Sequence, residues 1–241
     1  MTLTVGSLFS GIGGMDLGLE RAGHKVVWQS EIDAYACKVL KKHWPDVPNL
    51  GDITTIDWNK VERPDIICGG YPCQPFSHAG KRNGTADPRH LWPAMHNAIC
   101  QLRPSYALME NVRGHLSMGF GDVLADLAKI GYDAEWQCIP AAAVGALHKR
   151  DRVFIVAYPN SSRRNGNGQP SRQKKTQPKF ASSSTHFTKH DKQEWETEPN
   201  VGRVANGIPN RVDRLRGLGN AVVPQVSELV GRFIAEHAKT I

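Results

Sequence analysis

The chain has 241 residues, 40% of them apolar, and a formal net charge of +7. This length and composition suffice for one large domain with an ordinary core, and no apolar stretch is long enough to span a bilayer. The N-terminus lacks the pattern of a secretory signal, so we expect a cytoplasmic protein without a membrane partner. Five scattered cysteines without C-x-x-C spacing indicate neither a disulfide framework nor a zinc cluster.

Short apolar runs alternate with stretches of helical periodicity along much of the chain. We expect strands at 3–9, 25–32, 64–70, 105–111, 133–139 and 152–158, and helices at 14–22, 33–43, 91–103 and 121–130. The alternation predicts an α/β fold with a mostly parallel sheet, and the runs at 66–68 and 153–157 lack the polar alternation of a half-exposed strand. A last amphipathic helix is expected at 221–237, with an apolar face formed by Val222, Val226, Leu229, Val230 and Phe233.

Between the last of these strands and the final helix, the sequence loses its periodicity. Residues 158–205 carry nine basic and four acidic side chains and are rich in Ser, Asn, Gln and Pro. The excess of positive charge fits a polyanionic partner, because Lys and Arg displace counterions from phosphates. A solvated loop with little core of its own is the alternative interpretation of the same composition.

Three turns carry candidates for cofactor binding, because ligands of such sheets bind at the carboxyl ends of the strands. Phe9-x-Gly11-x-Gly13 follows the first strand and opens a helix, with a spacing that differs from the dinucleotide fingerprint. Glu31 ends the second strand, where an acid would bind ribose hydroxyls, and Asp52 follows in "GDI". Together they predict an adenosine-containing cofactor without a pyrophosphate. For each acid taken singly, a surface acid or a helix cap remains the alternative interpretation.

Two further strand ends carry residues suited to covalent chemistry. Cys73 stands between Pro72 and Pro75 in "CGGYPCQPFS", where a restricted backbone would fix the direction of a nucleophilic thiol. Glu110 ends the strand that contains "LMEN", and burial there should raise the pKa of its carboxyl so that it can donate a proton to a ring nitrogen. A cap network with Asn111 is the alternative for Glu110. We interpret the other four cysteines as packing residues.

Seven blocks, in this order, resemble the motifs of the DNA (cytosine-5)-methyltransferase family. They are "LFSGIGGMDLGLERAG", "SEIDAYACKVLKKHWP", "GDI", "GGYPCQPFSHAGKR", "MENVRG", "HKRDRVFIVA" and "RLRGLGNAVVPQV". The closing stretch is most similar to compact bacterial and phage-borne members. The resemblance implies a Rossmann-like S-adenosylmethionine methyltransferase sheet with helices on both faces. It divides the chain into a catalytic and cofactor-binding region at 1–157, a short, irregular target-recognition region at 158–200 and a returning C-terminal segment at 201–241.

The resemblance also implies a reaction. Cys73 would add to carbon 6 of a cytosine flipped out of double-stranded DNA, and Glu110 would act as the acid at N3. Carbon 5 would then take the methyl group of S-adenosylmethionine, which leaves S-adenosylhomocysteine; no metal is implied. Arg150 and Arg152 would hold the cytosine and support Glu110. His148 stands where the family pattern has Gln.

Further positions follow from the matched motifs. The implied cofactor-binding residues are Phe9, Gly11, Gly13, Glu31, Ile32, Asp52, Ile53, Pro72, Asn220 and Val222. Ile32 replaces an aromatic residue that is frequent in the family, so we expect weaker stacking on adenine. Residues 77–90 match the loop that closes over DNA. The implied DNA-binding residues are Ser77, Lys81, Arg82, Arg89, Arg163, Arg164, Lys174 and Lys175.

The expected partners are double-stranded DNA and a cognate restriction endonuclease, in restriction-modification or in the protection of phage DNA, with the chain itself a monomer. Two alternatives stay open. The chain could methylate cytosine in RNA, against which the sequence "PCQP" and the similarity to phage-borne members favour DNA. It could also be a catalytically silent protein that binds DNA or cofactor, against which the presence of Cys73, Glu110 and both arginines argues.

Overall fold

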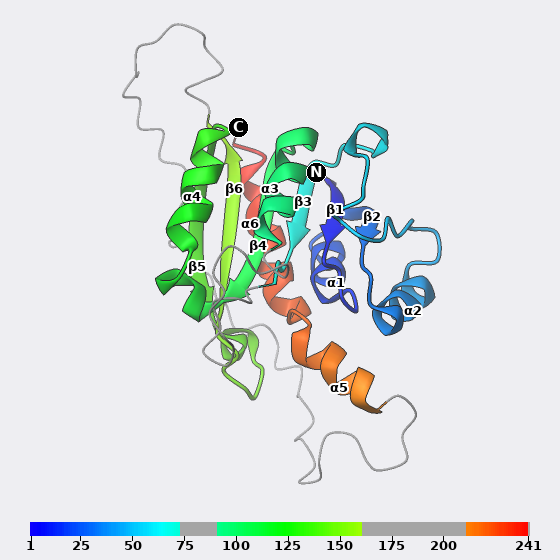
Figure 1. Cartoon of the computed structure of the whole chain (residues 1–241). Helices are drawn as coiled ribbons and strands as arrows, with labels where there is room; N and C mark the ends of the chain where they lie inside the picture. Colours follow the sequence, from blue (N-terminus) through cyan, green and yellow to red (C-terminus); the bar gives the residue numbers. More distant parts are fainter. Residues whose placement is uncertain (73–90, 161–210, 241) are drawn as a thin grey trace, which may run out of the picture.

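The described strands form one sheet in which a single strand runs against the others (Figure 1). The computed structural model describes residues 1–72, 91–160 and 211–240. Within these ranges the strands are β1 (Thr4–Leu8), β2 (Lys25–Ser30), β3 (Ile66–Gly69), β4 (Tyr106–Val112), β5 (Tyr132–Ile139) and β6 (Arg152–Pro159). Their order is β2-β1-β3-β4-β6-β5, with β6 antiparallel to both of its neighbours and the other pairs parallel. The expected mostly parallel α/β sheet is therefore confirmed.

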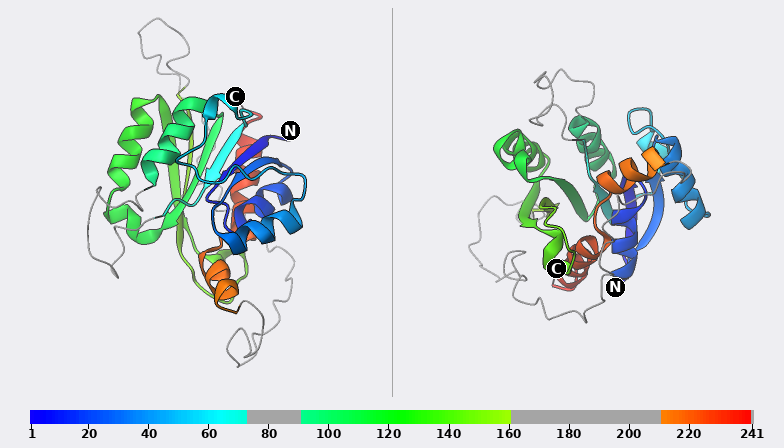
Figure 2. Two further views of the ribbon diagram at one scale, coloured as in Figure 1. Left: turned by 45° about the vertical axis from the view of Figure 1, so that its right-hand side comes forward. Right: turned by 90° about the horizontal axis from the view of Figure 1, so that it is seen from below.

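Helices cover both faces of this sheet (Figures 1 and 2). The described helices are α1 (Gly14–Arg21), α2 (Ala34–His43), α3 (Trp92–Leu102), α4 (Phe120–Lys129), α5 (Arg211–Asn220) and α6 (Pro224–His237). Helices α3 and α4 pack on one face, and α1 and α6 pack on the other. Helix α5 lies beyond the carboxyl ends of the parallel strands, where Gly217 is near Ile12 and Tyr35.

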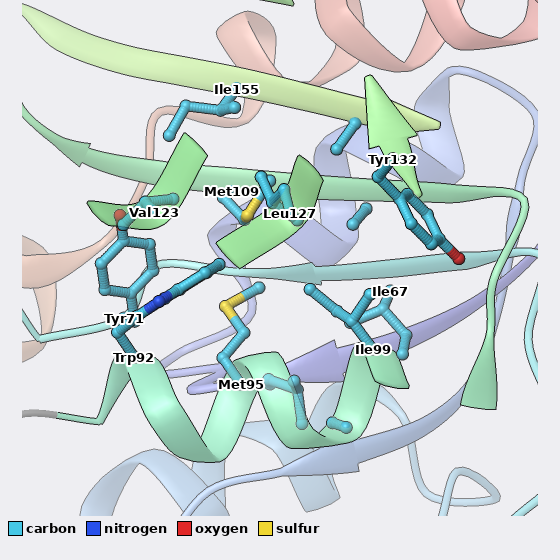
Figure 3. Close-up of a cluster of buried hydrophobic side chains, with 14 of the residues drawn as sticks. Ile67, Tyr71, Trp92, Met95, Ile99, Met109, Val123, Leu127, Tyr132 and Ile155 are labelled. Atoms are coloured by element: carbon cyan, nitrogen blue, oxygen red, sulfur yellow. The ribbon is translucent and has the colours of Figure 1, made fainter. Parts of the chain in front are cut away.

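A large hydrophobic cluster joins α3 and α4 to the central strands (Figure 3). Its fully buried members include Ile67, Met95, Ile99, Met109 and Leu127. Tyr71 and Trp92 lie at the end of this cluster that follows β3, with their ring centroids 5.3 Å apart. Burying a large apolar side chain stabilises a fold by about 1.5–3 kcal/mol. The cluster therefore holds in place the two strands that lead to the candidate catalytic residues.

On the other face, α1 and α6 approach each other so closely that glycine is required. A Cβ on Gly14 would lie 2.3 Å from the carbonyl oxygen of Val222, and one on Gly18 would lie 2.3 Å from that of Pro224. The apolar face expected for the last helix is largely present. Val226, Val230 and Phe233 are buried, and Val222 and Leu229 are partly buried against the same cluster. Helix α6 thus completes the face of the sheet that begins with β1.

The C-terminal segment differs from the expectation at its start. Helix α6 begins at Pro224 rather than at 221, because proline fits the first turn of a helix and disfavours helical backbone in the residue before it. Helix α5 was not expected from the sequence, since Gly217 and Gly219 lower its helix propensity. Leu218 on this helix is also 59% exposed, so α5 lacks a clear apolar face.

The remaining expected elements lie within two residues of the observed bounds. Cys68 is fully buried in β3, as expected for a packing residue, and Cys37, Cys100 and Cys138 are partly buried. Of the expected recognition region at 158–200, the structure describes only 158–160, which belong to the end of β6 and the residue after it. Among the helices in the described ranges, none has the length and apolar character needed to cross a membrane.

Candidate active site

The turn after β1 has a backbone shape that few residue types adopt. Phe9, Gly11 and Gly13 have φ angles of 53°, 56° and 82°. This left-handed region is open to glycine at low cost and is unusual for Phe. Gly13 is the N-cap of α1 and supplies no side-chain cap, so the turn leads its backbone directly into the helix N-terminus. Such a turn suits the close approach of a ligand to the backbone.

Glu31 binds this turn instead of lying free on the surface. One carboxylate oxygen, Oε2, accepts a hydrogen bond from the amide of Gly11 at 2.7 Å. The other, Oε1, accepts from the amides of Ile32 and Asp33 at 2.8 and 2.7 Å. The carboxylate therefore joins the turns that follow β1 and β2. Its role toward a cofactor stays a prediction.

The two residues of the "GDI" motif have different environments. Asp52 is exposed, and its Oδ1 accepts hydrogen bonds from the amide and the hydroxyl of Thr54 at 2.9 and 2.8 Å, which lower the pKa of the carboxyl. Ile53 is only 6% exposed and belongs to the hydrophobic core. Ile32 is 71% exposed. Asp52 and Ile32 are thus accessible at this edge, while Ile53 serves mainly in packing.

Glu110 occupies a buried corner at the end of β4. Its side chain is 12% exposed, and its Oε1 accepts a hydrogen bond from Nε of Arg152 at 2.9 Å. The antiparallel pairing of β4 with β6 sets Arg152 opposite Val112, so Arg152 and Glu110 are diagonal neighbours on one face. Burial raises the pKa of Glu110, and the charges of Arg152 and Arg150 oppose that shift. A Cβ on Gly70 would lie 2.7 Å from Oε2, so a side chain there would displace the carboxyl from this position.

Arg150 makes contacts that the sequence analysis did not predict. Its guanidinium donates hydrogen bonds to the carbonyl oxygens of Gly219 and Ala221, at 2.6 and 2.8 Å. Burial lowers the pKa of Arg150, while Arg152 also lowers it and Glu110 opposes the shift. Arg150 thus joins the end of α5 and the residue after it to this corner. Of the two arginines, only Arg152 forms a direct ion pair with Glu110.

Hydrogen bonds of Asn111, Tyr71 and His115 hold the backbone just after β3, two residues before Cys73. The side-chain amide of Asn111 donates to the carbonyl oxygen of Tyr71 at 3.1 Å. The hydroxyl of Tyr71 forms a hydrogen bond of 2.7 Å with Nε2 of His115, which lies in a 3-10 turn after β4. Asn111 therefore serves the turn after β3 and makes no cap for Glu110. His115 gave no signal in the sequence, since a histidine in a turn resembles an ordinary surface residue.

The other predicted cofactor residues have varied surroundings. Asn220 is exposed at the end of α5, and Pro72 is partly buried. Val222 lies against Gly14, and together with Val223, Arg150 and Arg152 it lines a small pocket. Nδ1 of His148 is buried and has no hydrogen-bond partner among the described residues.

Several predicted residues cannot be located in the structure. The predicted nucleophile Cys73 lies outside the described residues. So do all the DNA-binding candidates: Ser77, Lys81, Arg82, Arg89, Arg163, Arg164, Lys174 and Lys175. Within the described ranges, no group of three or more His, Cys, Asp or Glu side chains is arranged to hold a metal ion.

The sequence also matches a family model, that of the C-5 cytosine-specific DNA methylases, over residues 3–210. The chain belongs to this family. It is 39% identical over 165 residues to the type II methyltransferase M.Eco47II of Escherichia coli, a match that covers 65% of this chain and 40% of the relative. It is 36% identical over 165 residues to M.NgoMIV of Neisseria gonorrhoeae, covering 66% and 53%. The chain thus spans about half or less of the length of these relatives.

Solved structures of the same fold support this assignment. A triple mutant of Spodoptera frugiperda DNMT2 is 26% identical, with a TM-score of 0.57 over 66% of this chain and 50% of that one. The S. pombe Dnmt2 methyltransferase, at 24% identity, has the same TM-score over 66% of this chain and 51% of its own and shows the likeness of fold. The family resemblance and the methyltransferase fold expected from the motifs are therefore confirmed.

Proposed function

We propose that this DNA methylase chain transfers a methyl group from S-adenosylmethionine to carbon 5 of cytosine in double-stranded DNA. The observation that carries the proposal is the buried Glu110–Arg152 pair beside Gly70, three residues before Cys73 in a family motif. Its relatives are named type II methyltransferases, which supports a place in restriction-modification beside an endonuclease. The N-terminal α/β region would do the chemistry and the basic region at 158–200 would recognise DNA.

The residues that follow β2, together with the "GDI" turn, fit an adenosine-containing cofactor. A carboxylate has about four acceptor positions, and Glu31 uses three of them on backbone amides, which leaves capacity for a ribose hydroxyl. Asp52 is exposed for a polar group of the base, and Ile32 offers an exposed apolar surface for its ring. When bound, S-adenosylmethionine would supply the electrophilic methyl group.

The protein's own groups would prepare cytosine to accept that methyl group. The Cys73 thiolate would form a bond to carbon 6 while Glu110 donates a proton to N3, so that electron density collects at carbon 5. Burial favours the protonated form of Glu110 needed for this donation, and Arg152 holds its carboxyl in place. After methyl transfer, loss of the proton from carbon 5 and breakage of the sulfur–carbon bond would release Cys73.

The substrate must also reach this site. A cytosine inside a duplex is covered by its neighbours, so it must leave the stack, at a cost of a few kcal/mol. We propose that Lys81, Arg82 and Arg89 contact DNA from the loop at 77–90, together with Ser77. The basic residues Arg163, Arg164, Lys174 and Lys175 would neutralise phosphates, which orients DNA without selecting its sequence.

Trapping of the covalent intermediate tests this function. Duplex DNA with 5-fluorocytosine at the target, incubated with S-adenosylmethionine and the full chain, should give an adduct that survives denaturant. Bisulfite sequencing of DNA from cells that express the chain would first identify the target. Cys73→Ala should abolish the adduct, and Cys100→Ala, a matched control on α3, should preserve it. An adduct with Cys73→Ala would contradict the assigned nucleophile, and methyl transfer to transfer RNA but not to duplex DNA would contradict the substrate.

A further inference from the structure

The exposed side chain of Asn49 makes four hydrogen bonds near the predicted cofactor-binding residues Glu31 and Asp52. Oδ1 of Asn49 accepts hydrogen bonds from the amides of Glu31 and Gly51, at 3.0 and 3.1 Å. Its Nδ2 donates to the carbonyl oxygen of Glu31 at 3.1 Å and to Sγ of Cys37 at 3.2 Å. Both backbone polar groups of Glu31 therefore bind the same side chain.

The contacts of Asn49 continue the connection between β2 and the segment before Gly51 at the point where the backbone hydrogen bonds between them end. The segment before Gly51 runs beside β2, with Gln29 donating to the carbonyl oxygen of Pro48 at 2.9 Å and accepting from the amide of Leu50 at 2.7 Å. Gly51 then turns away with a φ of 76°. The side chain of Asn49 continues the connection beyond that point, so that the turn before Asp52 stays at a fixed distance from the end of β2.

The connection extends to the glycine turn through Glu31. Because Asn49 binds the amide and the carbonyl of Glu31, it fixes the peptide groups on both sides of that residue's Cα. The direction of the carboxylate follows from this backbone, and the carboxylate in turn accepts the amide of Gly11. Glu31 and Asn49 thus link three turns, those at Gly11, at Glu31 and at Gly51.

We propose that Asn49 is a positioning residue for S-adenosylmethionine: it holds Glu31 and the Gly51–Asp52 turn at the spacing that ribose and adenine require. The inference rests on the cofactor of the proposed function. Asn49 belongs to neither hydrophobic cluster and is exposed, so its removal should change the geometry of this edge more than the stability of the core. Its own side chain need not touch the cofactor.

Calorimetric titration of the full chain with S-adenosylhomocysteine tests the inference without any measurement of activity. Asn49→Ala removes all four contacts and should weaken binding about tenfold or more. Asn49→Asp keeps the acceptor for the two amides and loses the donor, so it should weaken binding by more than about twofold but by less than Asn49→Ala does. Asn59→Ala is the matched control, because Asn59 is another exposed asparagine, and among the described residues its side chain bonds only to nearby Asp57. It should bind within about twofold of the parent.

Methyl transfer and melting curves separate positioning from folding. The KM for S-adenosylmethionine should rise in Asn49→Ala while kcat at saturating cofactor stays within about twofold, with a melting temperature close to that of Asn59→Ala. If Asn49→Ala fails to fold, the binding of Asn49→Asp decides. Affinity within twofold of the parent in the folded variant would overturn the inference alone. A parent chain that binds no S-adenosylhomocysteine would overturn the proposed cofactor and the inference with it.

Discussion

Two regions at the same end of the sheet differ in the bonds that hold them. After the roles proposed for them, we call Gly11, Glu31, Asn49 and Gly51 the cofactor edge, and we call Gly70, Glu110, Arg150 and Arg152 the catalytic corner. At the cofactor edge, polar side chains bind backbone amides and carbonyls close to solvent. At the catalytic corner, a buried carboxyl depends on the charge of one partly buried arginine.

Because their bonds differ, the two regions should respond differently to substitution. Hydrogen bonds near solvent can be replaced by water, so changes at the cofactor edge should mainly alter its geometry and its affinity for ligand. A buried charge that loses its partner has no such replacement, so changes at the catalytic corner should alter both stability and proton donation. Four substitutions test this contrast.

The largest effect is expected for Glu110→Gln at the catalytic corner. An amide keeps the shape of the side chain but has no acidic proton, and loss of general acid catalysis typically lowers a rate by about 10²–10⁴-fold. Affinity for S-adenosylhomocysteine should stay within about twofold of the parent, because Glu110 is not part of the cofactor edge. Single-turnover methyl transfer and calorimetry measure the two quantities. An unchanged rate would remove Glu110 from the mechanism.

Removing the arginine should chiefly affect stability. In Arg152→Met the Glu110 carboxyl keeps its burial and loses its ion pair, which should cost about 3 kcal/mol in the free energy of unfolding at pH 7. The pKa of Glu110 should rise further, so that lowering the pH recovers part of the loss. The double variant Glu110→Gln with Arg152→Met should be more stable than Arg152→Met alone. Urea unfolding of the four proteins measures this, and additive losses would show that the two side chains do not interact.

At the cofactor edge, Glu31→Gln is the matched change. The carboxylate accepts three backbone amides, and an amide side chain would place a donor against at least one of them. Hydrogen bonds to charged groups contribute about 1.5–3 kcal/mol, so S-adenosylhomocysteine should bind at least tenfold more weakly, with a smaller loss in unfolding free energy. Calorimetry and urea unfolding distinguish these. Equal affinity in the variant and the parent would reduce Glu31 to a purely structural residue.

The smallest effect is expected from Asp16, which is fully buried in the first turn of α1. Its Oδ2 accepts a hydrogen bond from Gln29 at 2.9 Å, and burial raises the pKa of the carboxyl from 3.8 to about 6. The folded state therefore binds the proton more tightly than the unfolded state, so the contribution of Asp16 to stability falls as the pH rises from about 4 to about 6. Between pH 4 and pH 7, the free energy of unfolding should therefore fall by about 1–2 kcal/mol less in Asp16→Asn than in the parent. Urea unfolding at pH 4 and pH 7 tests it, and identical pH profiles would contradict it.

The strand ends could be located well from the sequence, whereas the contacts between them could be predicted only in part. Glu31 and Glu110 could be predicted because each follows a short apolar run, and the run determines where the strand stops. The pairing of Arg152 with Glu110 was expected from the family resemblance alone, because it depends on β6 lying antiparallel between β4 and β5, which apolar periodicity does not indicate. Arg150 reaches carbonyls about seventy residues away in the chain. Asn49 acts through its turn, and turn geometry leaves no periodic pattern.

The close packing of α1 on α6 should allow the chain to be cut into two fragments that still associate. Gly14 and Gly18 bring the two helices together at backbone distance, and Arg150 binds carbonyls just before α6. These contacts join the C-terminal segment to the rest of the described structure, and they are independent of the peptide bonds between Asn160 and Arg211. Two separately expressed fragments, cut within that stretch, would present complementary surfaces and reassemble without a linker. The helix pair would then act as the docking surface of a split methylase.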